Sequence, residues 1–171
     1  MKLTLYMAMS IDGIVALSAD EDISAYSSRE DREFFLSRLK THDAVITGRV
    51  SARHAVSLPR FVLTRTPRAY AADTRGANPA PTTYLCGTPA EICAAVSGAG
   101  YANVALLGGP AANHGFLRDS LVDELFLTVE PVMLGRGRSL NVQEELRVRW
   151  TLRETLRLND AGTLVLHYSR R

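Results

Sequence analysis

The chain has 171 residues, of which 46% are hydrophobic and 22% charged, and its formal net charge is +2. These values are ordinary for a soluble globular protein, and the length predicts a single domain over residues 1–171 with a substantial buried core. Because the arginines are spread along the chain, a concentrated basic face is missing, and we expect no nucleic-acid partner.

Signals for a membrane, for secretion and for metal binding are missing from the sequence. The apolar stretch from Leu3 to Ile11 is too short to span a membrane and meets no cleavage site, so we expect a cytoplasmic protein with no membrane partner. Cys86 and Cys93 have no neighbouring histidine, which favours two packing residues in a reduced protein. The four histidines lack metal-ligand spacing, so we expect no metal site.

Strand and helix patterns alternate along the first two thirds of the chain. Short apolar segments predict strands over residues 2–10, 43–48, 60–64, 82–86 and 103–108. Polar, irregular sequence occupies 11–27, and a Pro/Ala/Gly-rich loop is predicted from 67 to 81. A short helix is expected to begin at Gly48-Arg49.

Two longer helices carry start signals. Ser28 is followed three residues later by Asp31 in a capping arrangement. Thr88-Pro89-Ala90-Glu91 combines an N-cap threonine, a proline at the first helical position and a glutamate at the third, which is a strong helix start.

The last third of the chain has the alternation of β-strands. A strand is predicted from Asp123 to the turn at 135–138, and two alternating segments around 159–162 predict a hairpin. Strand–helix alternation followed by an antiparallel tail predicts a three-layer α/β fold with a mixed, mostly parallel sheet and a C-terminal antiparallel hairpin.

The segment 104–118, VALLGGPAANHGFLR, runs from a buried strand into a helix through Gly108-Gly109. The first N–H groups of such a helix are unpaired and point at one spot, which suits a phosphate or diphosphate. Pro110 suits the first turn, where its missing donor is no loss. A tight turn without a ligand is the alternative for a lone Gly-Gly pair.

Four motifs in one order give the chain a family resemblance. SIDG at 10–13, DAVITGR at 43–49, VALLGGPAAN at 104–113 and LVDELFLTVEPVMLGRGRSL at 121–140 together resemble the reductase domain of riboflavin biosynthesis, the C-terminal half of a bifunctional deaminase-reductase. This resemblance implies a dihydrofolate reductase-like fold. It also implies NADPH as cofactor, hydride transfer to a small heterocyclic or imine-like substrate, and a homodimer.

In that reading the cofactor lies at the carboxyl ends of the strands, where doubly wound sheets bind ligands. Gly108, Gly109 and the N–H groups of Ala111 and Ala112, which follow Pro110, would hold the diphosphate. Asn113 would cap or orient this loop, or have a purely structural role. The remaining cofactor contacts that the resemblance implies are Thr47, Gly48 and Arg49 in a second loop and Ala8 beside the nicotinamide carboxamide.

Residues after the third predicted strand bear on the choice of cofactor. NADH sites commonly place a carboxylate at the ribose hydroxyl. Here Thr64, Arg65 and Thr66 follow the strand, and no acidic residue occurs before Asp73. We therefore predict NADPH over NADH, with Thr64 and Arg65 among its contacts.

Three residues are candidates for the substrate side. Ser10 and Asp12 follow the first strand, where either could contact substrate or only form the turn, and Asp12 could act as an acid. Glu130 ends an otherwise apolar strand, and a buried glutamate needs a partner or a raised pKa, as a general acid has. The catalytic prediction is therefore Asp12 and Glu130.

The sequence departs from the riboflavin enzymes in two places. The zinc-ligand motifs of the deaminase half, HxE and PCxxC, do not occur, and SARHAVSLP replaces a longer segment after Arg49. The substrate and pathway stay open, and Arg136 and Arg138 are either a substrate-phosphate site or an exposed turn. Two alternatives also stay open: a dihydrofolate reductase proper, with Glu30 or Asp31 as its pteridine carboxylate, and a non-catalytic NADPH-binding module.

Overall fold

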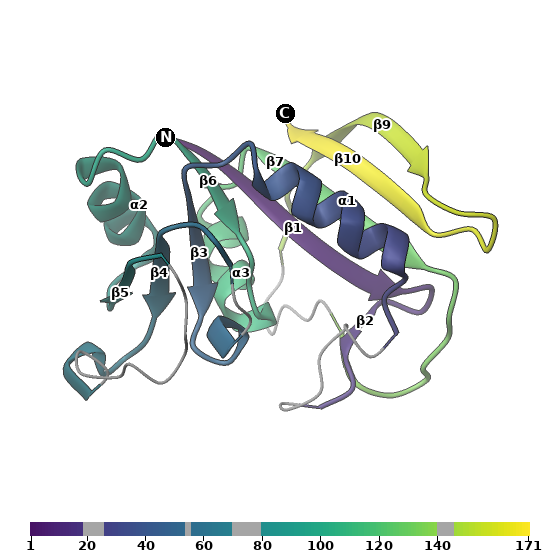
Figure 1. The fold of residues 1–171 in the computed structure, drawn as a ribbon, viewed down its shortest axis with the longest axis horizontal. Helices are drawn as coiled ribbons and strands as arrows, with labels where there is room; N and C mark the ends of the chain where they lie inside the picture. Colours follow the sequence, from purple (N-terminus) through teal and green to yellow (C-terminus); the bar gives the residue numbers. More distant parts are fainter. Residues whose placement is uncertain (19–25, 54–55, 70–79, 140–145) are drawn as a thin grey trace.

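A computed structural model of the protein describes residues 1–18, 26–53, 56–69, 80–139 and 146–171. Its main sheet has eight strands in the order β5-β4-β3-β6-β1-β7-β10-β9, and a second sheet pairs β2 with β8 (Figure 1). The strands are β1 Lys2–Ser10, β2 Ile14–Ala16, β3 Ala44–Gly48, β4 Arg60–Leu63, β5 Thr82–Leu85, β6 Asn103–Leu106, β7 Glu124–Glu130, β8 Arg138–Ser139, β9 Trp150–Arg157 and β10 Leu164–Arg170.

The sheet is parallel from β5 to β7 and turns antiparallel at its C-terminal edge. β1 lies between β6 and β7 and runs parallel to both, with Leu5 opposite Leu106 and Leu125. β10 pairs antiparallel with β7 and β9. The mixed, mostly parallel sheet and the closing hairpin that the sequence predicts are confirmed.

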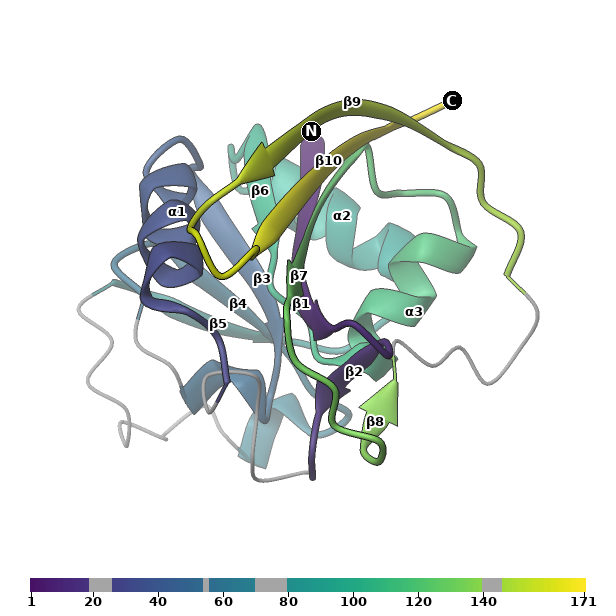
Figure 2. The same ribbon diagram turned by 90° about the vertical axis from the view of Figure 1, so that its right-hand side faces the viewer.

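Three helices cover the two faces of the main sheet (Figure 2). They are α1 Arg29–Leu39, α2 Pro89–Gly98 and α3 Pro110–Arg118, with short 3-10 turns η2 at Ser51–Arg53 and η3 at Pro67–Ala69. α1 lies on one face, and α2 and α3 lie together on the other. The helix predicted to begin at Gly48-Arg49 is the single turn η2.

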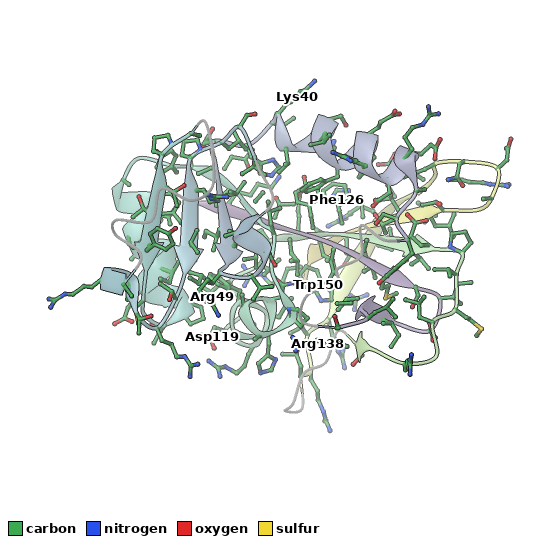
Figure 3. All side chains as sticks on the ribbon, turned by 60° about the horizontal axis from the view of Figure 1, so that its bottom comes forward. Lys40, Arg49, Asp119, Phe126, Arg138 and Trp150 are labelled. Carbon is green, nitrogen blue, oxygen red and sulfur yellow. The ribbon has the colours of Figure 1, made fainter. Side chains whose placement is uncertain are left out.

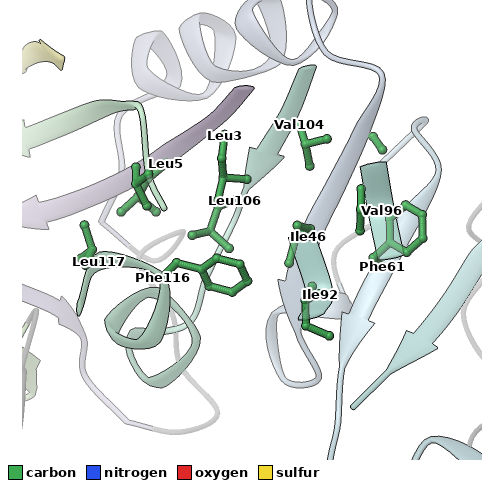
Figure 4. Packing of buried hydrophobic residues seen from close by; sticks show 12 residues of the cluster. Leu3, Leu5, Ile46, Phe61, Ile92, Val96, Val104, Leu106, Phe116 and Leu117 are labelled. Atoms are coloured by element: carbon green, nitrogen blue, oxygen red, sulfur yellow. The ribbon is translucent and has the colours of Figure 1, made fainter. Parts of the chain in front are cut away.

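The alternation of side chains along β1 divides the core between these faces. Leu3 and Leu5 join the cluster under α2 and α3, whereas Tyr6 joins the cluster under α1. Figure 4 shows Phe116 of α3 reaching toward the sheet beside Leu106, and both side chains are buried. The two apolar faces hold the helices in place, so the loops at the strand ends are free to form a site.

Both predicted helix starts form as expected. Ser28 accepts a hydrogen bond from the Asp31 N–H at the start of α1. Thr88 and Glu91 make the reciprocal capping box at the start of α2, with Pro89 in the first turn.

One element was predicted wrongly. The sequence 11–27 was expected to be irregular, yet Ile14–Ala16 forms β2 and pairs antiparallel with β8. Gly137 permits this close pairing, since a Cβ there would lie 2.5 Å from Ile14 Cγ2. Three-residue and two-residue strands carry too little periodicity to predict, and their pairing joins segments more than 120 residues apart.

Some predicted features fall wholly or partly outside the described residues. They are most of the loop predicted at 67–81, including Asp73, and part of the SARHAVSLP segment. Among the described helices, none is long and apolar enough to cross a membrane.

Candidate functional site

One open cleft, with a volume of about 2070 Å³, lies at the carboxyl ends of β3, β4 and β6 and between the starts of α1 and α3. Its lining brings together most of the predicted cofactor residues. They are Ala8, Thr47, Gly48, Arg49, Thr64, Arg65, Gly109, Pro110, Ala111, Ala112 and Asn113. Gly108, Ser10, Asp12 and Glu130 are not among the lining residues.

Gly108 shapes the loop rather than the cleft wall. Its φ of +72° favours glycine, and a Cβ there would lie 2.6 Å from Asn113 Nδ2. Its carbonyl accepts a hydrogen bond of 2.7 Å from the Gly48 N–H, which joins the two predicted cofactor loops. The two loops therefore stand in one fixed arrangement.

The start of α3 is open to the cleft. Gly109 is its N-cap and supplies no side-chain hydrogen bond, although its own N–H donates to Ser51 Oγ at 3.3 Å. A Cβ on Gly109 would meet no described atom closer than Ser51 Oγ, at 3.6 Å, so the space beside it is free. The N–H groups of Ala112 and Asn113 both donate to the Gly109 carbonyl at 3.0 Å, which leaves Ala111 as the predicted donor that precedes the helical ladder.

Asn113 adds a buried polar atom to this end of the cleft. Its side chain is 5% exposed, its Nδ2 lies 3.6 Å from Met7 Sδ, and its Oδ1 has no hydrogen-bond partner among the described residues. A buried carbonyl oxygen without a donor is costly. Asn113 therefore brings an unsatisfied acceptor to the protein behind the Gly108-Gly109 turn.

Positive charge is concentrated in the cleft, although the chain has a formal net charge of only +2. Asp31 is the one carboxylate among the described lining residues. The lining arginines are Arg29, Arg32, Arg49, Arg60, Arg65, Arg118 and Arg138. Figure 3 labels two of them, Arg49 after β3 and Arg138 in β8. Such a lining favours a ligand with several negative charges.

Arg60 is a lining residue that the sequence did not single out. It is 6% exposed, and its guanidinium donates to the Ala52 carbonyl at 2.5 Å and to Thr82 Oγ1 at 3.2 Å. Arg60 therefore fixes η2, which carries Ser51, against the sheet. An arginine at the first position of a strand gave no sequence signal for this role.

Asp31 lines the cleft from the first turn of α1, the helix that also contributes Arg29 and Arg32. It is 8% exposed, and its Oδ1 accepts a hydrogen bond of 2.6 Å from Thr128 Oγ1. Burial raises the pKa of Asp31, and the charge of Glu130 raises it further. From the sequence, Asp31 was a candidate site residue only in the dihydrofolate reductase alternative.

Glu130, the last residue of β7, is buried. Its Oε1 accepts from the Ser28 N–H at 2.8 Å and from Ser28 Oγ at 3.0 Å, and its Oε2 accepts from Thr163 Oγ1 at 2.8 Å. These contacts join the end of β7 to the start of α1 and to the hairpin of β9 and β10. The carboxylate is satisfied by the protein itself.

Asp12 and Ser10 brace the loop after β1. Asp12 accepts from Ser10 Oγ at 2.5 Å, from the Gly135 N–H at 2.7 Å and from the Leu134 N–H at 3.2 Å. The Ser10 hydrogen bond, followed by the Gly135 one, holds the pKa of Asp12 below its usual range. Asp12 thus ties the β1–β2 turn to the segment that leads into β8.

The sequence left the role of Arg136 and Arg138 open, and the structure distinguishes between them. Both are exposed, but only Arg138 belongs to the cleft lining, on the wall made by β2 and β8. In the described part of the chain no group of three His, Cys, Asp or Glu side chains could hold a metal ion.

The family model described as the RibD C-terminal domain matches residues 1–164. The chain belongs to this family. Among curated proteins, no sequence matches it significantly. RibD-type domains and dihydrofolate reductase are also its structural neighbours.

Solved structures with low sequence identity share the fold along nearly the whole chain. A proposed riboflavin biosynthesis protein from Shewanella sp. PV-4 has a TM-score of 0.79 and 20% identity, covering 100% of this chain and 99% of that one. A deaminase/5-amino-6-(5-phosphoribosylamino)uracil reductase from Thermotoga maritima has a TM-score of 0.78 and 13% identity, covering 99% and 56%. Dihydrofolate reductase from Enterococcus faecalis, solved with NADP(H), has a TM-score of 0.70 and 16% identity, covering 99% and 96%. The predicted dihydrofolate reductase-like fold is confirmed.

Proposed function

We propose that the protein is an NADPH-dependent reductase acting on a small heterocyclic or imine-like substrate. The observation that carries this proposal is the composition of the cleft lining, which combines an open helix start and several arginines with a single described carboxylate, the buried Asp31. Membership of the RibD C-terminal domain family and the reductases among the structural neighbours support the same class of reaction.

The residues of the arginine-rich side fit a phosphorylated dinucleotide. Gly109 and the N–H of Ala111 suit the diphosphate, because the space beside Gly109 is free and no side chain caps the helix. Arg65 and Thr64 suit a 2′-phosphate, since the described residues of this loop, 64–69, include no carboxylate for a ribose hydroxyl. Arg49 adds a further cation. The chemistry that NADPH supplies when bound is a hydride.

Asp31 suits the substrate side of the reaction. Reduction of a C=N bond adds a hydride to the carbon and a proton to the nitrogen, so the proton must come from the protein or from water. A buried carboxyl with a raised pKa keeps its proton to higher pH than an exposed one and, while protonated, can donate a hydrogen bond to the substrate. We assign this role to Asp31 in place of Asp12 or Glu130, because neither of those lines the cleft.

Titration of the protein with NADPH and NADH by fluorescence tests the cofactor assignment, with tighter binding of NADPH expected. Loss of absorbance at 340 nm across a panel of pterins, pyrimidines and carbonyl compounds then tests turnover. Asp31→Asn should retain NADPH binding and lower turnover by about 100-fold or more. Absence of NADPH binding would refute the proposal, and binding without turnover of any panel member would support a non-catalytic module.

A dihydrofolate reductase proper is the second candidate, and one contact favours it. Asp31 lies in the first turn of α1 and reaches Thr128 on the neighbouring strand within the cleft, as a pteridine-binding carboxylate would. Turnover of dihydrofolate that an antifolate blocks would select this candidate, while turnover of a pyrimidine alone would exclude it.

A further inference from the structure

Glu130 is a buried carboxylate that the proposed reaction does not use. It is 2% exposed and accepts three hydrogen bonds, two from Ser28 and one from Thr163. No cation pairs with it among the described residues. Burying a charge without a counterion is expensive, so its retention at the end of β7 calls for a reason.

The geometry connects Glu130 to Asp31 through two short paths. Thr128 and Glu130 are two residues apart on β7 and so share one face of the sheet, and Thr128 holds Asp31 Oδ1. Ser28 Oγ donates to Glu130 and accepts from the Asp31 N–H at 3.2 Å. The first turn of α1 is thus fastened to β7 at both its N-cap and its third residue.

Among the charged groups near Asp31, Glu130 has the most direct effect on its pKa. Of the charged groups in the described chain, Glu130 is the one that shifts the pKa of Asp31, after the larger effect of burial. Arg29, on the same helix, pairs with Glu30 and Glu33, and Glu30 accepts from Asn159 of the β9–β10 turn. Thr128 Oγ1 donates to Asp31 Oδ1, and this hydrogen bond and a second one from the Ser27 side chain both oppose the rise in the pKa of Asp31.

We propose that Glu130 is a positioning residue for Asp31. Hydrogen-bonded to Ser28 and Thr163, it fixes the first turn of α1 and, as a carboxylate, favours the neutral form of the cleft carboxyl by charge repulsion. The assignment of Asp31 to the reaction rests on the proposed function, whereas the coupling of the two carboxyls is a property of the protein alone.

Carbon-13 NMR of the carboxyl groups measures this coupling without any turnover. Spectra of the wild-type protein, with Asp31→Asn used for assignment, give the titration midpoint of Asp31. In Glu130→Gln, which keeps the size and removes the charge, that midpoint should move to lower pH. Thr163→Val is the matched control, because it removes a donor to Glu130 but keeps the charge, and its Asp31 midpoint should stay above that of Glu130→Gln.

Three results would overturn the proposal. They are an unchanged Asp31 midpoint in a folded Glu130→Gln, an equal downward shift in Thr163→Val, and a Glu130 signal in the wild type that protonates at higher pH than Asp31. The last needs no variant, so the proposal stays testable should Glu130→Gln fail to fold. If a substrate is found, the pH at which kcat falls should move in the same direction as the midpoint, with NADPH affinity unchanged. Loss of the proposed function alone would leave the NMR result intact.

Discussion

The starts of α2 and α3 differ in how they satisfy the same set of backbone donors. Both helices follow a parallel strand, lie on the same face of the sheet and begin with proline. At α2, Thr88 and Glu91 cap the helix reciprocally. At α3, Gly109 offers no side chain, and the helix start lines the cleft. The contrast between a helix start without a side-chain cap and one with a complete capping box supports the proposal that a phosphate group of the cofactor binds at α3.

Filling the open start of α3 should have the largest effect, which is on NADPH binding. Gly109→Val places two methyl groups in the space proposed for the diphosphate, so NADPH binding should fall by more than about 100-fold, or at least 2.7 kcal/mol. Gly98→Ala at the end of α2, where a Cβ meets nothing within 4 Å, is the control and should bind normally. Fluorescence titration measures both, and circular dichroism checks that each variant is folded. Wild-type affinity in Gly109→Val would remove this loop from the site.

Arg65 tests the outer part of the same site. Arg65→Ala should weaken NADPH binding by roughly 10–100-fold, the loss of a charge-assisted hydrogen bond worth about 1.5–3 kcal/mol, and should leave NADH binding nearly unchanged. Arg68→Ala, an exposed arginine of η3 outside the cleft lining, is the matched control. Equal losses for both cofactors would contradict a 2′-phosphate role.

Removing the cap of α2 tests the other half of the comparison. Thr88→Ala should lower the free energy of unfolding by about 1 kcal/mol, as the loss of an N-cap does, without changing NADPH affinity. Urea denaturation and cofactor titration of the same sample give the two quantities. A loss of affinity comparable to that of Arg65→Ala would show that α2 also contributes to the site.

The start of α1 is a third case, capped by Ser28 and also presenting Asp31 to the cleft. The pKa of Asp31 is raised on folding, so its neutral form is favoured in the native state. The stability that depends on this form is present below the unfolded value of 3.8 and is lost as the pH rises through the folded value.

Because asparagine is neutral at every pH, the Asp31→Asn variant should not show this loss of stability as the pH rises. Its free energy of unfolding, relative to the wild type, should rise with pH between these limits. Urea denaturation of the cofactor-free proteins over a pH series checks this smallest effect, which is a change of slope. A difference between variant and wild type that is constant with pH would contradict it.

Local sequence signals predicted the fold, and they singled out loops that the structure brings together in one cleft. The cap at Ser28, the capping box at Thr88 and the glycine turn before α3 each depend on residues within a few positions, and all formed as predicted. The β2–β8 pair could not be predicted in this way, because its register depends on Asp12 meeting N–H groups more than 120 residues away.

The carboxylates were harder to place for the same reason. From the sequence, Glu130 was a lone acid at the end of an apolar strand, where it could be either buried or exposed; the structure buries it. Its partners Ser28 and Thr163 come from other elements, 102 and 33 residues away, so only the folded chain shows that it is satisfied internally. Asp31 needed Thr128, 97 residues away, before its position in the cleft could be recognised.

The hydrogen bond from Thr163 to Glu130 has a consequence for the biosynthesis of the protein. Thr163 lies in the final hairpin, whose β10 pairs directly with β7. A ribosome makes this segment after α1, α2 and α3, so the contacts that hold the start of α1 are complete only when the last strand has been made. Because Val165 of β10 is buried in the cluster under α1, we expect truncation before residue 163 to deprive both that cluster and Glu130 of their packing and hydrogen-bond partners.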